Sequence, residues 1–429
     1  MEERQYWEPE TETASRERMR EIQTAKLKAL VKRAYHDTAF YRRRLDEAGI
    51  KPDDIRTLED VRKIPFTRYQ EDFVATPVDE KLAIPRGSVE RIISTSGTIS
   101  GSPQLVMLSE GDLRTCSDLF LRQMVTHGIG KGDVVQPLMP LVFQEGVAPR
   151  LGFTMVPFSH VTMMTDNAIK LINNARPTAL IAGPSQFLGV ARRAQDMGID
   201  MKQIGLRVAE FAGESWSNAY RRKMEKEWGI RFYDIYGATE TGIVALECSQ
   251  QAGMHCWEDT ILVEIIDPET GKTLGPGELG EVVVTTLYRE AMPLLRYRMG
   301  DVAAMLPYES CGCGRTFARI SRIKGRTEHM VWVGQARVFP VDVEEVIHEA
   351  PELTGEYQIL LRKPGEQEVL EVNTEYRQGT GGLPELAARL ERALEAGTGA
   401  RSKVNLVPSG KIPAGLQFKA QRLTKTYAE

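Results

Sequence analysis

The expected fold depends on the stretch Tyr233-Asp234-Ile235-Tyr236-Gly237-Ala238-Thr239-Glu240-Thr241-Gly242. Residues 232–236 are apolar or aromatic except for Asp234, which predicts a short buried strand. Gly237 is expected to end this strand, so that Thr239 and Glu240 lie at its carboxyl end. Ligands of open α/β sheets bind at the carboxyl ends of strands. The stretch is therefore either an ordinary strand end with a turn or part of a nucleotide site.

Three side chains of this stretch would suit a nucleotide. An aromatic ring can stack on a base, a hydroxyl can meet a phosphate, and a carboxylate can hold Mg²⁺. Taken alone, the ten residues do not decide between the two interpretations.

The composition predicts a globular chain of two or three domains, because 429 residues exceed one ordinary core. Hydrophobic residues make up 42% and charged residues 27%, and a formal net charge of -4 gives no sign of a nucleic-acid or membrane partner. No apolar run approaches the roughly 20 residues of a membrane span. The polar start of the chain is unlike a signal peptide, so we expect the cytoplasm.

A glycine- and hydroxyl-rich loop follows an N-terminal region, 1–85, whose pattern is helical and carries no chemistry. In residues 91–103 a short apolar start runs into serines, threonines and glycines. Such a loop can wrap phosphates with backbone N–H groups, or it can be a flexible hairpin turn. It is not a Walker loop, because the Gly-Lys-Ser/Thr ending is missing.

Strands and helices alternate from 130 to 245, which predicts a mainly parallel sheet with helices on both faces. Right-handed crossovers would place 212–214 and 236–237 at the same edge of this sheet. The expected strands are 133–138, 154–157, 178–182, 206–212 and 232–236, and the expected helices are 184–197 and one that Ser217 caps and Gly229 ends.

The pattern changes after 245. The expected elements are an antiparallel pair at 261–266 and 281–286, helices at 340–349 and 383–396 with Gly397 as the stop, a hairpin at 357–361 and 368–372, and a strand at 404–407. The α/β chain would thus have a large N-terminal domain at 1–326, with a β subdomain at about 246–326, and a small α+β C-terminal domain at 327–429.

Five motifs in this order resemble those of the phenylacetate–coenzyme A ligase group of the adenylate-forming superfamily. The resemblance covers nearly the whole chain and is strongest from about 207 to 346. It implies a mobile C-terminal domain and, weakly, a homodimer. The motifs are the loop 94–103, the strand end 211–214, the strand and turn 233–240, the segment 296–301, and the hinge 325–328 with 338–340.

The resemblance implies a two-step reaction with ATP, Mg²⁺ and coenzyme A. An aromatic carboxylate attacks the α-phosphorus of ATP, which gives an acyl-adenylate and pyrophosphate. Coenzyme A then displaces AMP and forms a thioester. Attack on a phosphate requires its negative charge to be offset by a metal and by hydrogen-bond donors.

The resemblance also implies roles for single residues. Thr239 would contact the α-phosphate, Glu240 would hold Mg²⁺ and Tyr236 would stack on adenine. Asp301 would accept from the ribose hydroxyls, and Arg326 would reach the nucleotide from the hinge. The other implied ATP- or AMP-binding residues are Ser96, Gly97, Thr98, Gly213, Glu214, Asp234 and Gly237.

A late lysine of the C-terminal domain would steady the charge at the α-phosphate. The family spacing places it after Ile412-Pro413, which favours Lys419. Lys411 is the alternative, because 408–411 resembles the general superfamily ending.

The chain departs from the family pattern at three places. The loop, usually Ser-Gly-Thr-Thr-Gly-Lys-Pro, is one residue longer at 96–103 and lacks the lysine. Glu328 stands at the hinge where the family usually has aspartate. The acyl pocket, formed by Phe143, Gln144, Glu145, Ala212 and Gly237, contains a carboxylate at Glu145 where relatives have a His-Tyr-Gly stretch. Because an unpaired buried charge is costly, we expect an aromatic acid with an amino, hydroxyl or ring N–H group.

Four of the five cysteines lie between 248 and 313, and an odd count argues against complete disulfide pairing. Cysteine and histidine at this spacing in a reducing compartment suggest structural zinc, and some relatives carry zinc in this place. Five unrelated thiols are the alternative. The expected ligands are Cys248, His255, Cys311 and Cys313.

Two other functions are compatible with parts of the sequence. One keeps adenylation but transfers the acyl group to a carrier-protein thiol, an amine or a hydroxyl. The other is a nucleotide-binding or zinc-ribbon protein without catalysis, against which the presence of Thr239, Glu240, Asp301, Arg326 and Lys419 argues.

Overall fold

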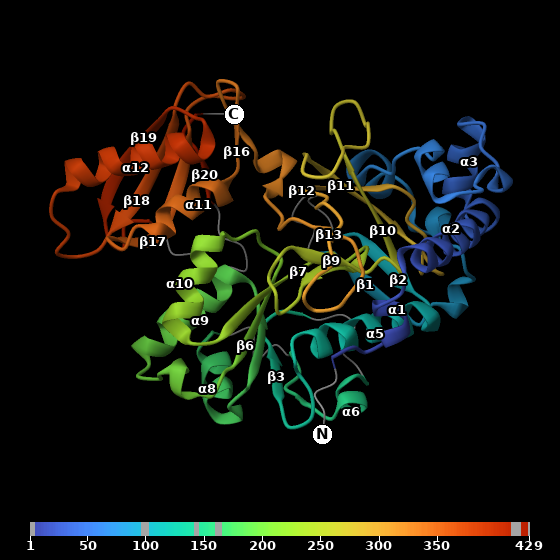
Figure 1. Cartoon of the computed structure of the whole chain (residues 1–429), viewed down its shortest axis with the longest axis horizontal. Coiled ribbons are helices and arrows are strands. Elements are labelled where there is room, and N and C mark those ends of the chain that lie inside the picture. The colour runs from blue at the N-terminus through green and yellow to red at the C-terminus, as the bar shows by residue number, and fades with distance from the viewer. Residues whose placement is uncertain (1–4, 96–102, 141–145, 159–164, 413–421, 428–429) are drawn as a thin grey trace. The chain divides into compact units, whose positions relative to one another are not determined.

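The computed structural model describes residues 5–95, 103–140, 146–158, 165–412 and 422–427 (Figure 1). The chain divides into two compact units, and each combines segments that are distant in sequence. The first unit consists of residues 1–133, 140–155 and 233–322, and the second consists of 134–139, 156–232 and 323–429.

The first unit begins with helices, as the sequence predicts. The Ser15 side chain accepts a hydrogen bond from the Arg18 N–H and caps α2, the longest of these helices. The apolar stripe of α2 is buried in a core that also contains Leu287 and Leu295. The described helical elements are α1 (Pro9–Glu12), α2 (Arg16–Asp37), α3 (Ala39–Glu47), α4 (Val78–Lys81), α5 (Glu110–Thr126), α6 (Ala148–Leu151), the 3-10 helices Pro52–Asp54, Leu58–Lys63 and Arg86–Ser88, and the π-helix Tyr69–Val74.

Mainly antiparallel strands make up the rest of this unit. The expected pairing of 261–266 with 281–286 is confirmed, with Ile261 opposite Thr286. A further strand, β12, pairs with β11 and carries the 296–301 motif from Tyr297 onward. The strands are β1 (Arg91–Ser94), β2 (Leu105–Leu108), β4 (Thr154–Met155), β8 (Gly242–Glu247), β9 (Met254–Cys256), β10 (Ile261–Ile266), β11 (Leu279–Thr286), β12 (Tyr297–Ala304), β13 (Arg319–Ile320) and most of β7 (Arg231–Ala238).

Gly237 does not end its strand, contrary to the prediction. β7 continues to Ala238, and a short turn leads into the antiparallel strand β8. The register shifts between Tyr236 and Gly237, and a Cβ atom on Gly237 would lie 2.3 Å from the Gly242 carbonyl oxygen. Glycine is therefore required here for the close approach of two backbones and not for a chain break.

The second unit contains the predicted parallel strands, with β5 between β3 and β6. The Ser217 side chain caps α10, and Gly229, with a left-handed φ of 68°, ends it as expected. Phe187, Phe211 and Phe232 lie together in the core. The elements are β3 (Val134–Pro137), α8 (Thr165–Ala175), β5 (Ala179–Ala182), α9 (Pro184–Asp196), the 3-10 helix Met201–Gln203, β6 (Val208–Ala212) and α10 (Asn218–Trp228).

The end of the chain forms an α+β part of the second unit, in which α11 and α12 pack on the sheet (Figure 1). β17 and β18 form the predicted hairpin, while β19 and β20 pair in parallel with β18 and β17. The elements are β14 (Gly325–Arg326), the 3-10 helix Thr327–His329, β15 (Val331–Val333), β16 (Ala336–Val338), α11 (Pro340–Glu349), β17 (Leu353–Leu361), β18 (Leu370–Tyr376), α12 (Leu383–Thr398), β19 (Ser402–Pro408) and β20 (Leu423–Lys425).

The predicted stop of the last helix at Gly397 is wrong. α12 continues to Thr398, and Gly399 ends it with a left-handed φ of 70°. A glycine stops a helix when its backbone takes the left-handed conformation, and Gly399 rather than Gly397 does so.

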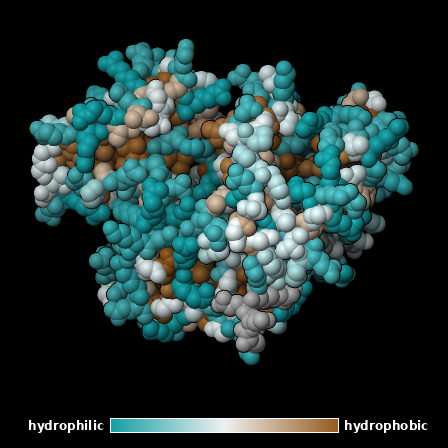
Figure 2. Space-filling model, viewed as in Figure 1, coloured by the Kyte–Doolittle hydropathy of each residue, from teal (hydrophilic) through white to brown (hydrophobic). Residues whose placement is uncertain are grey.

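Hydrophilic residues predominate on the face of the molecule that Figure 2 shows. Within the part of the chain that the structure describes, no helix is both long enough and apolar enough to cross a membrane.

Candidate nucleotide site and metal centre

A hydrogen bond joins two of the sequence motifs in the first unit. Tyr236 on β7 donates its hydroxyl to Asp301 Oδ2 on β12 at 3.0 Å. Tyr236 is buried, and Asp301 is half-buried. The residue expected to stack on adenine and the residue expected to accept from ribose therefore lie side by side, although 65 positions separate them.

The turn between β7 and β8 presents Thr239 and Glu240. The Thr239 side chain is half-buried and Glu240 is buried. Glu240 Oε1 lies 3.4 Å from the hydroxyl of Tyr297, the first residue of β12. This contact ties the turn to the same strand that carries Asp301.

The start of β12 is fixed by a buried arginine with complete pairing. Arg296 has a left-handed φ of 43°, a strained conformation for a residue with a side chain. Its guanidinium makes two hydrogen bonds to Glu264, of 3.0 and 2.9 Å, and also donates to the carbonyls of Arg62 and Ile64. The segment therefore holds Tyr297 and Asp301 in place through contacts that do not involve a ligand.

Asp234 has a protein partner. Its Oδ2 accepts from Arg322 Nε at 3.0 Å, and its backbone N–H donates to Glu247 at 3.0 Å. The neighbouring Tyr233 ring stacks on His127 with 4.1 Å between ring centroids. Asp234 thus contributes to the rigidity of β7, and its expected contact with a nucleotide stays a prediction.

In the second unit, the strand end after β6 carries a carboxyl group with a shifted pKa. Ser185 donates to Glu214 Oε2 at 2.6 Å. Desolvation is the main reason that the pKa of Glu214 is raised to about 7. Ala212 is half-buried, and Gly213 is exposed with a left-handed φ of 84°.

The hinge residues of the second unit form an ion pair. Arg326 Nε lies 3.2 Å from Glu328 Oε1, and the Glu328 side chain is exposed. Glutamate at this position therefore contacts the arginine that the resemblance directs toward the nucleotide. The expected site residues that lie outside the described residues are Ser96, Gly97, Thr98, Phe143, Gln144, Glu145 and Lys419.

Sequence reasoning missed three residues that contact the candidate site residues. Tyr297 belongs to the 296–301 motif, and its position in the same motif as Asp301 is a sequence signal that it contacts the site. Arg322 and Ser185 carried no signal, because their partners Asp234 and Glu214 lie 88 and 29 positions away.

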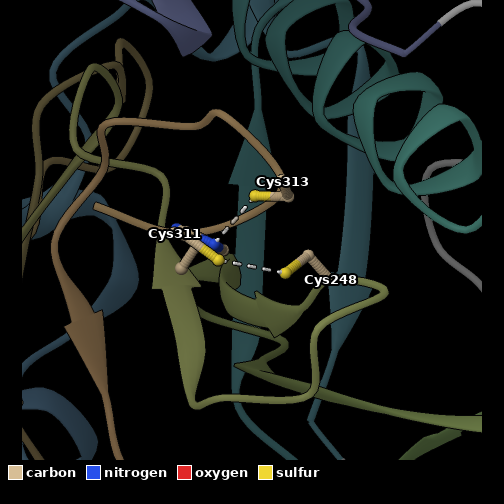
Figure 3. A group of neighbouring side chains, drawn as sticks. Cys248, Cys311 and Cys313 are labelled. Carbon is tan, nitrogen blue, oxygen red and sulfur yellow. Dashed lines mark hydrogen bonds between the residues drawn. The ribbon is translucent and has the colours of Figure 1, made fainter. Parts of the chain in front are cut away.

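The structure brings the four expected zinc ligands together in the first unit. The ligand atoms of Cys248, His255, Cys311 and Cys313 all lie within 4.8 Å of one another, and all four residues are buried. Figure 3 shows the three labelled cysteines converging on one point. The Cys248 and Cys311 sulfurs are 3.6 Å apart, and Cys313 Sγ is 3.4 Å from His255 Nε2.

The two contacts, of 3.6 Å between sulfurs and 3.4 Å between sulfur and nitrogen, fit a tetrahedral zinc ion. Ligand atoms at the usual zinc distances of about 2.0 to 2.3 Å lie about 3.3 to 3.8 Å from each other in a tetrahedron. His255 Nδ1 is 3.3 Å from the Phe317 carbonyl, which directs Nε2 toward the cysteines. A hydrogen bond with His255 lowers the pKa of the Cys311 thiol, and metal binding requires the thiolate form.

The beginning of the chain contacts the loop that carries two of these cysteines. The Gln5 amide and the Tyr6 hydroxyl donate to the Cys313 carbonyl at 3.0 and 2.8 Å. Arg315 Nε donates to the buried Glu12 carboxylate at 2.8 Å. The loop around Cys313 is therefore held from outside the metal site.

The chain belongs to the AMP-binding enzyme family. The model of this family matches residues 12–287, and the model of the AMP-binding enzyme C-terminal domain matches residues 336–426. The hydrogen-bonded motif residues and the C-terminal α+β part described above lie in or between these two matches.

Within this family the chain is similar to phenylacetate–coenzyme A ligases. It is 34% identical to the enzyme of Thermus thermophilus over 97% of this chain and 98% of that protein. It is also 34% identical to the enzyme of Pseudomonas putida over 94% and 93% of the two chains. The fold matches a crystal structure of 2-hydroxyisobutyryl-CoA ligase in the postadenylation state, with a TM-score of 0.89, 23% identity, and 98% and 92% of the two chains covered.

Proposed function

We propose that the protein is an AMP-forming ligase that activates an aromatic carboxylic acid with ATP and transfers it to coenzyme A. The observation that carries the proposal is the hydrogen bond between Tyr236 and Asp301. It joins an aromatic ring suited to a base and a carboxylate suited to a ribose, beside the Thr239-Glu240 turn. The full-length similarity to phenylacetate–coenzyme A ligases supports both the aryl substrate and the thiol acceptor.

Residues of the turn and of β12 each have a separate role in the first step, which is formation of the acyl-adenylate. The Tyr236 ring stacks on adenine, while Asp301 accepts from the ribose hydroxyls and fixes the sugar. Thr239 donates to the α-phosphate as negative charge builds up during attack by the acid. Glu240 fits Mg²⁺, because its carboxylate oxygens are the hard ligands that this ion prefers, and the ion offsets phosphate charge when bound.

The remaining residues of the proposed site come from other segments of the chain. Gly213 and Glu214 line the base, and Arg326 reaches the nucleotide while Glu328 holds its guanidinium. Lys419 places a positive charge at the attacking carboxylate and the α-phosphate. The backbone and hydroxyls of Ser96, Gly97 and Thr98 hold the leaving phosphates.

The acid substrate carries a hydrogen-bond donor on or near its ring. The family resemblance assigns Glu145, with Phe143 and Gln144, to the acyl pocket, and a carboxylate in such a pocket needs a hydrogen-bond donor. We therefore expect an aromatic acid with an amino, hydroxyl or ring N–H group to react faster than phenylacetate.

Zinc has a structural role at Cys248, His255, Cys311 and Cys313. Four protein ligands leave no open position for catalysis, so the ion would pin the segment after β8 to the loop before β13. All five cysteines lack a disulfide in the structure. Free thiols are typical of proteins in a reducing compartment such as the cytoplasm, which we propose as the location.

The test is acid-dependent release of pyrophosphate, followed by its stimulation by coenzyme A. A panel of aryl acids identifies the substrate, and hydroxylamine or a carrier-protein thiol in place of coenzyme A tests the other acceptors. Turnover that requires hydroxylamine or the carrier-protein thiol and does not occur with coenzyme A would refute coenzyme A as the acceptor. Absence of pyrophosphate release with every acid would overturn the whole proposal.

Two lysine variants test the adenylation residue. K419A should lose acid-dependent pyrophosphate exchange by about a hundredfold or more and still form thioester from a supplied acyl-adenylate. K411A, at an exposed position, is the matched control and should keep both activities. The reverse pattern would assign the role to Lys411.

A further inference from the structure

Arg289 is a buried cation with spare hydrogen-bonding capacity. It lies between β11 and β12 and is completely buried. Its Nη2 donates to the Glu240 carbonyl at 3.1 Å. Its Nε and Nη1 atoms are also buried and have no hydrogen-bond partner among the residues that the structure describes. Among the described residues, no carboxylate oxygen lies within ion-pair distance of this guanidinium.

Other buried arginines of the same unit are paired. Arg122 makes a hydrogen bond of 2.8 Å to Asp259, and Arg296 makes one of 2.9 Å to Glu264. A guanidinium that is removed from water without a counterion is strongly disfavoured. Arg289 is thus an exception to the rule that the rest of the unit follows.

Asp112, one of the two carboxylates that raise the pKa of Arg289, does not serve as the missing partner. The Asp112 carboxylate accepts from three backbone N–H groups, those of Ser109, Glu290 and Ala291, at 2.7 to 3.0 Å. These bonds cap α5 and fix the chain next to Arg289. The carboxylate is therefore engaged in holding the loop and forms no ion pair with the guanidinium.

Arg289 stays charged in this environment. Desolvation would lower its pKa, but Tyr288, Cys116, Asp112 and Glu240 act in the opposite sense, and the pKa is raised overall. A cation is therefore held under the turn that presents Thr239 and Glu240.

We propose that Arg289 binds an oxyanion of the substrates, which is either a phosphate of ATP and its product pyrophosphate or the carboxylate of the acid. An oxyanion would accept hydrogen bonds from Nε and Nη1 of Arg289 and would also supply the negative counterion that this guanidinium lacks. The bond to the Glu240 carbonyl places the guanidinium at the turn where both anions meet in the proposed function, on which this inference rests. None of the sequence motifs contains Arg289.

The experiment uses the full-length protein and an aryl acid that the wild type turns over, with AMP formation as the readout. R289M removes the charge, and R289K keeps a charge without the planar fork. The constants are the KM for ATP, the KM for the acid and the inhibition constant of pyrophosphate. R122M is the control, because it removes another buried arginine and should lower the melting temperature without changing these constants.

We expect R289M to raise at least one of these constants tenfold or more and R289K to raise the same constant three- to tenfold. A rise in the KM for ATP and in the inhibition constant of pyrophosphate would show that Arg289 binds a phosphate. A rise in the KM for the acid would show that it binds the carboxylate. Constants within threefold of wild type in both variants would overturn the inference. If R289M does not fold, R289K decides by the same constants. A wild type without acid-dependent AMP formation would instead refute the proposed function.

Discussion

Ser217, the N-cap residue of α10, donates its backbone N–H to the Glu344 carboxylate on α11 at 2.6 Å, so one helix caps the amino end of another. The Ala219 N–H likewise donates to Glu345 at 2.9 Å. The first N–H groups of a helix have no partner within it, and the helix dipole favours negative charge there. The two carboxylates therefore join α11 to α10 by satisfying groups that would otherwise be unpaired.

Removal of the Glu344 carboxylate should destabilise the second unit. Glu344 is buried, so E344A leaves the Ser217 N–H unpaired and should lower the free energy of unfolding by about 1 to 3 kcal/mol. E349A is the matched control, because its ion pair with Arg222 is exposed and should contribute less than about 1 kcal/mol. Urea unfolding of both variants gives the comparison, and equal losses would contradict the capping role.

The contact between Tyr236 and Asp301 predicts unequal effects on ATP binding. D301N removes the charged acceptor for ribose and should raise the KM for ATP by about 10- to 100-fold. Y236F keeps the ring that stacks on adenine and loses one hydrogen bond, so the rise should be about tenfold at most. Y308F, at an exposed tyrosine, should leave this KM unchanged. A KM for ATP in D301N equal to that of wild type would exclude Asp301 from ribose binding.

The local ends of helices could be read from the sequence, because their causes lie within a few residues. Ser15 and Ser217 cap their helices through their own hydroxyls, and Gly229 ends α10 in the left-handed conformation. The prediction that Gly237 ends its strand is wrong because the need for a glycine there does not come from its immediate neighbours in the sequence. Its role is set by the backbone of Gly242 across the hairpin, and a glycine shows the same single letter whether it ends a strand or lets two strands approach.

Residues of the candidate site could be predicted where their type alone indicates a chemical role. They could not be predicted where the role depends on a contact with a residue distant in the sequence. The four residues that could hold a metal ion were recognised because cysteine and histidine are rare and clustered. The partner of Asp234 could not be found, because nothing in the sequence distinguishes Arg322 from Arg319 and Arg326, the other arginines of the basic stretch 319–326. Arg289 is the clearest example, because its buried Nε and Nη1 atoms lack hydrogen-bond partners among the described residues, and the sequence gives no sign of this.

The shifted pKa of Glu214 predicts a pH dependence of stability. The folded pKa of about 7 lies above the ordinary value of 4.5, so the unfolded chain loses its proton first as pH rises. The stabilising effect is complete below pH 4.5 and is lost as pH passes through about 7, a change on the order of 3 kcal/mol. E214Q cannot ionise and should lack this component.

Urea unfolding of wild type and E214Q at pH 5 and pH 8 measures the difference. Other groups titrate in both proteins and cancel in the comparison. Wild type should lose more stability than E214Q between the two pH values, and parallel losses would show that Glu214 is ionised in the folded protein at both.

The N-terminal contacts to the cysteine loop predict a residue that controls metal release. Arg315 lies two positions from Cys313 and is buried, and its guanidinium joins the Glu12 carboxylate to the Gln5 carbonyl. These contacts hold residues 5–12 against the loop, where Gln5 and Tyr6 donate to the Cys313 carbonyl. Loss of outer contacts of a metal site typically weakens binding by about 10- to 100-fold.

R315M should therefore release zinc to a chromophoric chelator at least about tenfold faster than wild type while all four ligands are retained. R18M, at an exposed arginine of α2 that pairs with Glu21, is the matched control and should release zinc at the wild-type rate. C313S removes a ligand and sets the upper limit of the rate. Equal release from folded R315M and wild type would mean that the four ligands hold the metal without help from the N-terminal segment. Less than about a tenth of an equivalent of zinc in the purified wild type would count against the metal site itself.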